Sequence, residues 1–212
     1  MTQYFDEDPT VESAPRDVTW SLPDGPLTLT TDRGVFGYDR VDTGTKLLLL
    51  KAPAPPDAGH LLDLGCGTGA IAITLARRAP TATVWAIDVN ARARELCVHN
   101  AARLGITTIH VAHPDDVPSH LRFAAIWSNP PIRIGKPALH HLLTTWLKRL
   151  APDAAAHLVV QKHLGADSLQ RWLTSGGMPA ERVATGAGFR VLRVRRAPQL
   201  SAASRVDLHP DT

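Results

Sequence analysis

Short apolar segments alternate with longer segments of helical periodicity along the chain from residue 60 onward. The short segments are typical of buried β-strands, and the longer ones are typical of helices with one apolar face. The strands are expected at residues 60–65, 83–88, 107–112, 123–129 and 155–162, and the helices at 70–79, 91–104, 137–150 and 168–175. Strands that alternate with helices form a mostly parallel sheet with helices on both faces. The sequence therefore predicts a doubly wound α/β fold.

The regions on either side of this alternation set the expected domain boundaries. Residues 182–196 are typical of an antiparallel hairpin that completes the sheet, with its turn at Gly186 to Gly188. Ahead of residue 60, two short strands around a Pro-Asp-Gly-Pro turn are followed by a helix. We predict a disordered acidic tail at residues 1–17, an N-terminal strand-and-helix extension at 18–56, the main catalytic domain at 57–197 and a loose tail at 198–212.

The composition excludes several classes of protein. Hydrophobic residues make up 44% of the 212, which excludes a mainly disordered chain, and two cysteines are too few for a disulfide scaffold. No apolar run approaches the ~18 residues of a membrane span, and the polar, acidic first residues lack a signal-peptide pattern. His140 and His141 have no partners at the spacing of a metal site. We expect a cytoplasmic protein that binds no metal.

The net charge of +3 is unevenly distributed along the chain. Residues 1–50 hold nine acids and four bases, a net charge of −5, whereas residues 51–212 hold eleven acids and nineteen bases, a net charge of +8. Six arginines and one glutamate lie between residues 171 and 196. A basic region of this kind suits a polyanion such as nucleic acid, although an ordinary solvated surface gives the same count.

A glycine-rich turn, running from Asp63 to Ala70 with the sequence DLGCGTGA, connects the strand at 60–65 to its helix. Ligands of open α/β sheets bind at such turns, because glycine lets the backbone approach them closely. Gly65, Gly67 and Ala70 also match the dinucleotide pattern G-x-G-x-x-G/A. A nicotinamide cofactor is therefore one interpretation of this turn.

Two carboxylates favour S-adenosylmethionine over a nicotinamide cofactor. Asp63 would repel a pyrophosphate, but it would attract the ammonium group and the cationic sulfur of adenosylmethionine. Asp88 ends the next strand, where it can accept both hydrogen bonds from the ribose diol of either cofactor. Cys66 is expected to present its backbone to the ligand rather than act as a nucleophile. The candidate cofactor-binding residues in these two turns are Asp63, Gly65, Cys66, Gly67, Gly69, Asp88 and Val89.

A second motif, Ser128-Asn-Pro-Pro-Ile132, directly follows the strand at 123–129. Its consecutive prolines fix the backbone, so the side-chain carbonyl of Asn129 and the backbone carbonyl of Pro130 can offer two acceptors at one point. Two such acceptors can hold both hydrogens of a planar exocyclic amine and align its nitrogen with a sulfonium methyl group, without a strong general base. A proline turn that only ends a strand is the alternative. The candidate catalytic residues are Asn129, Pro130 and Pro131, and Asn129 is also a cofactor-binding candidate.

Both motifs resemble those of class I S-adenosylmethionine-dependent methyltransferases, whose Rossmann-like fold has a mostly parallel seven-stranded sheet that ends in an antiparallel hairpin. The Asn-Pro-Pro-Ile motif resembles the (N/D/S)-P-P-(Y/F/W/I) signature of enzymes that methylate amine nitrogens. Residues 129–136, 32–48 and 161–166 resemble the single-domain relatives of the small-subunit (16S) ribosomal RNA guanine-N2 methyltransferases. The resemblance implies S-adenosylmethionine as cofactor and an adenine-binding acid after the third strand, for which we choose Asp115. It also implies a target pocket near Phe36 and Arg133. Ile132 can pack on a base, and Arg133 and Lys136 can contact phosphates, so the candidate substrate-binding residues are Phe36, Ile132, Arg133 and Lys136.

These observations predict methyl transfer to an exocyclic amine of structured RNA, with guanine N2 of small-subunit ribosomal RNA as the first choice. Methylation of a protein glutamine, methylation of adenine N6 and an inactive RNA-binding assembly factor remain alternatives. The expected partner is ribosomal RNA or a ribosomal subunit, with no membrane, and a homodimer is one option for the assembly. The arginines expected to hold RNA phosphates are Arg190, Arg193, Arg195 and Arg196.

Overall fold

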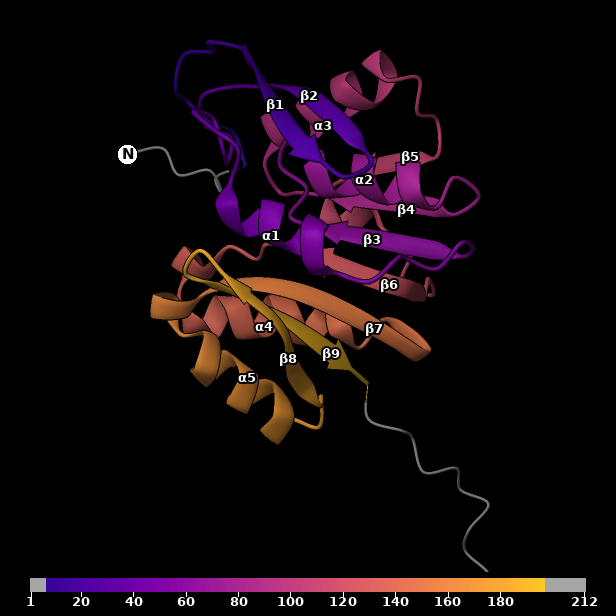
Figure 1. Cartoon of the computed structure of the whole chain (residues 1–212), viewed down its shortest axis with the longest axis vertical. Helices are drawn as coiled ribbons and strands as arrows, with labels where there is room; N and C mark the ends of the chain where they lie inside the picture. The colour runs from indigo at the N-terminus through magenta and orange to yellow at the C-terminus, as the bar shows by residue number, and fades with distance from the viewer. Residues whose placement is uncertain (1–6, 197–212) are drawn as a thin grey trace, which may run out of the picture.

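Seven strands form one twisted sheet in the computed structural model, which describes residues 7–196 (Figure 1). The strands are β3 (His60–Leu64), β4 (Thr83–Ile87), β5 (Ile109–Ala112), β6 (Phe123–Ser128), β7 (Leu150–Gln161), β8 (Ala180–Gly186) and β9 (Phe189–Arg195). Their order is β5-β4-β3-β6-β7-β9-β8. The first five pair in parallel, whereas β9 is antiparallel to both β7 and β8. The predicted α/β sheet with a C-terminal antiparallel hairpin is confirmed.

Within residues 7–196, five α-helices cover the two faces of this sheet. They are α1 (Thr43–Lys51), α2 (Ala70–Arg78), α3 (Ala91–Arg103), α4 (Lys136–Leu147) and α5 (Ala166–Ser175). Apolar residues of α1, α2 and α3 pack on one face, and those of α4 and α5 pack on the other. The central strands β3 and β6 are consequently buried on both faces, as apolar strands between two helix layers must be.

The order of the strands reverses at β3, which has β4 on one side and β6 on the other. Helices that leave neighbouring strands in opposite directions open a crevice beyond the carboxyl ends of those strands. The glycine-rich turn follows β3, and the Asn-Pro-Pro-Ile motif follows β6. The topology therefore brings the two sequence motifs to the same edge of the sheet.

A separate antiparallel hairpin, formed by β1 (Arg16–Leu22) and β2 (Gly25–Thr31), packs against α3. The backbone N–H of Thr30 donates to Asn100 Oδ1 and Asn100 Nδ2 donates to the Thr30 carbonyl, both at 2.8 Å. Arg103 also pairs with Asp17 at 3.1 Å. Because Asn100 is fully buried, these backbone bonds both satisfy its amide and hold the hairpin in place.

Part of the segment for which we predict disorder, before the start of β1, makes contacts with the rest of the fold. The Ser13 hydroxyl and the Ala14 N–H each donate to the Asp32 carboxylate at 2.6 Å, and Arg92 donates to the Val11 carbonyl at 3.0 Å. Its polar composition concealed these contacts, because their partners lie far along the chain. The rest of that expectation, residues 1–6, and the tail expected at 198–212 lie outside the described residues. In the described part of the chain, no helix is both long and apolar enough to cross a membrane.

Candidate active site

A cavity of about 720 Å³ lies beyond the carboxyl ends of β3, β4 and β6. Ten candidate residues from the sequence line it, namely Phe36, Gly65, Gly67, Asp88, Val89, Asn129, Pro130, Pro131, Ile132 and Arg133. Lining residues that sequence reasoning did not select include Val35, Tyr38, Arg40, Asp42, Pro114, Gln161, Leu164 and Phe189. Cavities of this volume hold small-molecule ligands and cofactors in other proteins. The fold thus gathers most of the candidates around one site.

The glycine-rich turn is tied to the end of β4. The N–H groups of Gly65 and Cys66 both donate to the Ile87 carbonyl at 2.9 Å, and the Gly67 N–H donates to Asp88 Oδ2 at 2.9 Å. Gly65, Gly67 and Gly69 all have positive φ, which favours glycine strongly over other residues. A Cβ atom on Gly69 would lie 2.8 Å from Cys97 Sγ. The turn therefore favours its three glycines for conformation, and it needs Gly69 for close packing as well.

The Asp63 side chain is fully buried beneath this turn. Its Oδ2 accepts a hydrogen bond from the Ala72 N–H of α2 at 2.9 Å, while Oδ1 has no hydrogen-bond partner among the described residues. Burial, with the charge of Asp88 nearby, raises the pKa of Asp63 to about 8. The carboxyl group lies behind the lining residues of the large cavity, where it supports the first turn of α2.

Asp88 and Val89 lie in the cavity wall directly after β4. Asp88 Oδ1 accepts from the Asn90 N–H at 3.0 Å, and Oδ2 accepts from Gly67, as described above. Both oxygens are thereby oriented, and each keeps a lone pair for a further donor. Burial is the largest effect on the pKa of Asp88 and raises it above its ordinary value. The geometry suits a carboxylate that accepts hydrogen bonds from two neighbouring hydroxyl groups.

Asn129 lies where β6 ends, and its side-chain amide is anchored from α1. Nδ2 donates to Asp42 Oδ1 at 2.8 Å and to Thr45 Oγ1 at 3.0 Å. Because the nitrogen faces these two partners, the carbonyl Oδ1 is the atom left for a ligand in the cavity. Asp42 and Thr45 hold this candidate amide, and sequence reasoning did not select them as site residues. Their only signal was the Asp-x-Gly-Thr segment, residues 42–45, which lies within the resembling residues 32–48 and to which no role was assigned.

The two prolines and Ile132 form a tight turn at the cavity wall. The Ile132 N–H donates to the Pro130 carbonyl at 2.8 Å, and Pro131 between them has φ −73° and ψ 78°, close to an inverse γ-turn. The Pro130 carbonyl therefore has one partner already, and a second acceptor position remains for a ligand. Ile132 and Arg133 begin a short 3-10 helix, Ile132–Ile134, with Arg133 exposed at the cavity rim.

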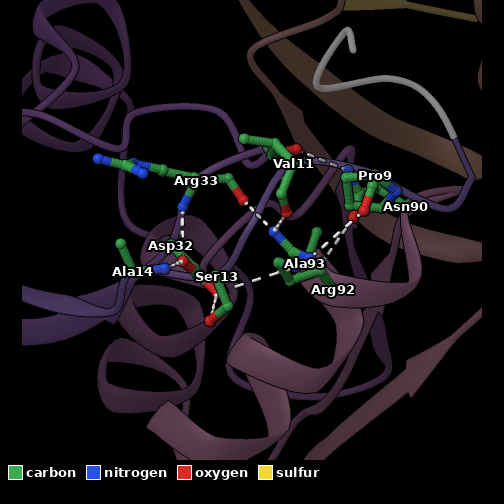
Figure 2. A network of polar contacts seen from close by, with 10 residues as sticks. Pro9, Val11, Ser13, Ala14, Asp32, Arg33, Asn90, Arg92 and Ala93 are labelled. Atoms are coloured by element: carbon green, nitrogen blue, oxygen red, sulfur yellow. Dashed lines mark hydrogen bonds and ion pairs between the residues drawn. The ribbon is translucent and has the colours of Figure 1, made fainter.

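The loop that carries Phe36 is held by a polar network on the α3 side of the cavity, drawn in Figure 2. Arg92 Nη1 donates to the carbonyls of Val11 and Arg33 at 3.0 and 2.6 Å. Asn90, the N-cap of α3, donates to the Gly34 carbonyl at 2.9 Å. This network joins the N-terminal segment, the Phe36 loop and the first turn of α3. The network therefore stabilises the wall of the cavity that contains Phe36, from the side of α3.

Besides Asp63, four candidates lie apart from the residues that line the large cavity. Cys66 lines a smaller neighbouring cavity of about 40 Å³, and Gly69 is the N-cap of α2. Asp115 has a side chain that is 90% exposed and pairs with His113 at 3.6 Å; its neighbour Pro114 is the residue in the cavity wall. Lys136 begins α4 and is exposed. Residues 7–196 contain no group of three or more His, Cys, Asp or Glu side chains placed to bind a metal ion.

The arginines of β9 differ from the expected phosphate-binding row. Arg190 is buried and pairs with Asp167 of α5. Arg193 pairs with Glu181 of β8, and Arg195 lies 3.7 Å from the same carboxylate. Alternation along the strand directs Arg190 to one face of the sheet and Arg193 and Arg195 to the other. Three of the four arginines thus have carboxylate partners within the fold.

Comparison with known proteins identifies the family. A model of the family described as "Methyltransferase small domain" matches residues 26–193. The chain belongs to this family. Its resemblance to class I S-adenosylmethionine-dependent methyltransferases is thereby confirmed.

Curated relatives are similar over most of this chain. The uncharacterized protein YbxB of Bacillus subtilis is 38% identical over 168 residues, which cover 78% of this chain and 84% of that protein. The ribosomal RNA small subunit methyltransferase C of Pseudomonas aeruginosa is 37% identical over 187 residues, which cover 84% of this chain and 54% of that enzyme. The chain therefore spans about half the length of this named methyltransferase.

A solved structure shows the same fold. The 16S rRNA N2 methyltransferase RsmC of T. Thermophilus, determined in complex with AdoMet and guanosine, superposes with a TM-score of 0.72 at 21% identity. The match covers 89% of this chain and 52% of that one. A ribosomal protein L11 methylase from Lactobacillus delbrueckii subsp. bulgaricus follows with a TM-score of 0.61. These likenesses establish the seven-stranded methyltransferase fold for this family member.

Proposed function

We propose that this chain transfers a methyl group from S-adenosylmethionine to the exocyclic N2 amine of a guanine in small-subunit ribosomal RNA. The observation that carries the proposal is the anchored amide of Asn129. With Nδ2 bonded to Asp42 and Thr45, Oδ1 is available to accept a hydrogen bond from an amine in the cavity. Pro130, whose carbonyl would be the second acceptor of the turn, lines the same cavity.

The residues around the cavity fit S-adenosylmethionine. Backbone of Gly65 and Gly67 would border its amino-acid end, and the oriented carboxylate of Asp88 would accept from its ribose hydroxyls. The unpartnered Oδ1 of Asp63 lies beneath the same turn and would favour a cationic group there. When bound, S-adenosylmethionine would supply a sulfonium methyl group. The amine nitrogen would donate its lone pair to this methyl carbon, and sulfur would keep the electrons of the broken C–S bond. The nitrogen would then lose a proton to water.

The role of this chain's own residues is to position the amine. Oδ1 of Asn129 and the carbonyl of Pro130 would hold its two hydrogens, which directs the nitrogen lone pair away from them and adds negative potential where positive charge develops. Ile132 would pack against the face of the base, with less stacking than an aromatic side chain gives. Because the product amine can lose its proton to water, the turn needs no strong general base.

Two observations favour ribosomal RNA over a protein glutamine. The Pseudomonas aeruginosa relative described above, which is 37% identical, is named as a small-subunit ribosomal RNA methyltransferase. Arg40 and Arg133, both in the wall of the cavity, can contact phosphates on either side of an inserted nucleotide. The N2 amine of guanine is supported by the N2 specificity in the name of the structural neighbour.

Methyl transfer to ribosomal subunits tests the proposal. Purified small subunits and naked RNA from cells lacking this protein are incubated with tritiated S-adenosylmethionine, and the product nucleosides are analysed. We expect label in N2-methylguanosine with the unchanged chain, and at least ~100-fold less with Asn129→Ala, the size of effect seen when one preorganised polar group is removed. Asp24→Ala is the matched control, because it breaks an ion pair with Arg78 outside the cavity.

Each other outcome of this experiment has a definite meaning. Label in a glutamine of a ribosomal protein, or in adenine, would show that this group is the methyl acceptor instead of guanine. Absence of label in every ribosomal substrate would overturn the proposed function. Full activity of Asn129→Ala would show that the Asn129 amide has no role in the reaction.

A further inference from the structure

The Asp-x-Gly-Thr segment that begins α1 reaches the candidate catalytic amide across the fold. Asp42 is the N-cap of α1, and 87 positions separate it from Asn129. Its Oδ1 accepts both from the Thr45 N–H at 2.6 Å and from Asn129 Nδ2 at 2.8 Å. One carboxylate oxygen therefore links the first turn of α1 to the turn after β6.

A primary amide can turn over, exchanging its carbonyl oxygen and its NH2 group, and the two orientations have opposite chemistry. With Oδ1 toward the cavity, Asn129 accepts a hydrogen bond from an amine; with Nδ2 toward the cavity, it offers a donor to another donor. A carboxylate only accepts hydrogen bonds. It therefore stabilises the orientation in which Nδ2 faces Asp42, and it would repel the Oδ1 of a reversed amide.

The anchor itself is rigid. The Asp42 carbonyl accepts from the Lys46 N–H at 2.9 Å, as the first bond of α1. Gly44 allows no side chain in this turn, because a Cβ there would lie 2.7 Å from the Phe189 ring in the cavity wall. The hydroxyl of Thr45 provides the second acceptor for the same NH2 group. The carboxylate consequently has a fixed place beside the amide.

We propose that Asp42 is a positioning residue of the methyl-transfer reaction. Through its hydrogen bond to Nδ2 it holds the Asn129 amide with the carbonyl oxygen toward the amine. Because the bond is charge-assisted, it also polarises the amide and makes Oδ1 a stronger acceptor. This inference rests on the proposed function for its catalytic consequence, whereas the orientation of the amide can be tested without any methyl-group acceptor.

Substitutions of Asp42 separate orientation from stability. Asp42→Ala removes the anchor, and we expect kcat to fall by ~30–100-fold, while the dissociation constant of S-adenosylmethionine changes less than ~3-fold. Asp42→Asn keeps an oxygen that accepts from both Thr45 and Asn129, and it should restore kcat to within ~10-fold of the unchanged chain. Asp24→Ala, which removes a carboxylate outside the cavity, should lower thermal stability with little effect on kcat.

Exchanging the two side chains gives a sharper test. Asn129→Asp alone places two carboxylates against each other, and we expect kcat to fall by at least ~100-fold at pH 7, with partial recovery at lower pH as one of them gains a proton. The double variant Asp42→Asn with Asn129→Asp returns an NH2 group between two oxygens and should regain at least ~10-fold in kcat. If Asp42 only stabilised α1, the double variant would not regain activity.

The NMR signals of the Asn129 side-chain NH2 group, assigned by their loss in Asn129→Ala, report the anchor directly. We expect slow hydrogen exchange in the unchanged chain and in Asp42→Asn, and at least ~10-fold faster exchange in Asp42→Ala. Unchanged exchange in Asp42→Ala would overturn the inference, as would a loss of kcat that Asp42→Asn fails to restore. If the unchanged chain methylates no ribosomal substrate, the proposed function fails, and the exchange rates still decide whether Asp42 anchors the amide.

Discussion

Burial distinguishes the two carboxylates that end β3 and β4. Asp88 lies in the cavity wall with both oxygens oriented by backbone N–H groups. Asp63 is fully buried, and desolvation raises its pKa to about 8. At neutral pH the protonated form of Asp63 therefore predominates in the cofactor-free protein. A cationic ligand group beneath the glycine-rich turn would instead favour the ionised form.

The raised pKa of Asp63 predicts a pH dependence of stability. In the unfolded chain Asp63 is ionised above pH ~4, whereas the folded protein keeps its proton up to about pH 8. The folded state therefore binds one more proton, and its stability falls as pH rises through this window, by roughly 1.4 kcal/mol per pH unit. Asp63→Asn carries no titrating proton, and its stability should stay flatter over the same range.

Urea unfolding of the cofactor-free protein between pH 6.5 and 8 measures this difference. The comparison cancels the contribution of His157, whose pKa burial lowers to about 4, because both chains contain this group and it affects stability equally in the two. Parallel curves for the unchanged chain and Asp63→Asn would show that Asp63 is ionised in the fold. The same titration with S-adenosylmethionine reports whether the cofactor favours the ionised carboxylate.

At the scale of elements, the N-terminal segment and the start of α3 act together on the cavity. Arg92 bonds to the carbonyls of Pro9, Val11 and Arg33 and lies 3.8 Å from the Asp32 carboxylate (Figure 2). A planar guanidinium carries five N–H donors on three nitrogens, so it can reach acceptors that lie further apart than the three donors of a single ammonium can. The loop between β2 and α1 that carries Phe36 is thereby fixed without any contact from Arg92 to the cavity.

Arg92→Ala should weaken cofactor binding through this loop. We expect the dissociation constant of S-adenosylmethionine to rise by ~10-fold, equivalent to about 1.4 kcal/mol, because ordering the loop would then oppose binding. Calorimetry measures the change, and the dissociation constant of Arg92→Lys should lie between those of the unchanged chain and Arg92→Ala. Arg103→Ala is the matched control, since Arg103 bonds from the other end of α3 to Asp17 and Thr28 of the hairpin. Equal affinities in Arg92→Ala and Arg103→Ala would show that the loop keeps its position without Arg92.

The sheet and its helices could be predicted from the sequence because each has a local signal. Apolar periodicity located β3 to β6 and α2 to α4 within a few residues. The start of β7 was missed, since Pro152 and Asp153 interrupt its pattern, and Asp153 has a positive φ of 62° where the pairing with β6 shifts. The anchor from Asp42 to Asn129 was also missed. It depends on a contact between segments 87 residues apart, for which a single sequence has no periodic signal.

For the RNA substrate that we propose, the arginines best placed to contact phosphates lie around the cavity rather than along β9. Carboxylates within the fold pair with Arg190 and Arg193, and Glu181 lies close to Arg195 as well. A paired arginine would have to give up its partner to contact a phosphate, which reduces the gain in free energy. Arg40 and Arg133 line the cavity where a target nucleotide would enter. Their charges are therefore the ones that a nearby RNA backbone would neutralise.

The salt dependence of RNA binding distinguishes these two sets of arginines. Each phosphate contact adds about −0.9 to the slope of log K against log salt concentration for duplexes, and about −0.7 for single strands. Arg40→Ala with Arg133→Ala should therefore make the slope less steep by ~1–2, and should weaken binding to a small-subunit ribosomal RNA fragment. Arg193→Ala with Arg195→Ala removes the same charge from β9 and should change the slope by less than ~0.5. The reverse result would mean that β9 gives up its carboxylate partners to bind RNA, and that the rim arginines act only within the cavity.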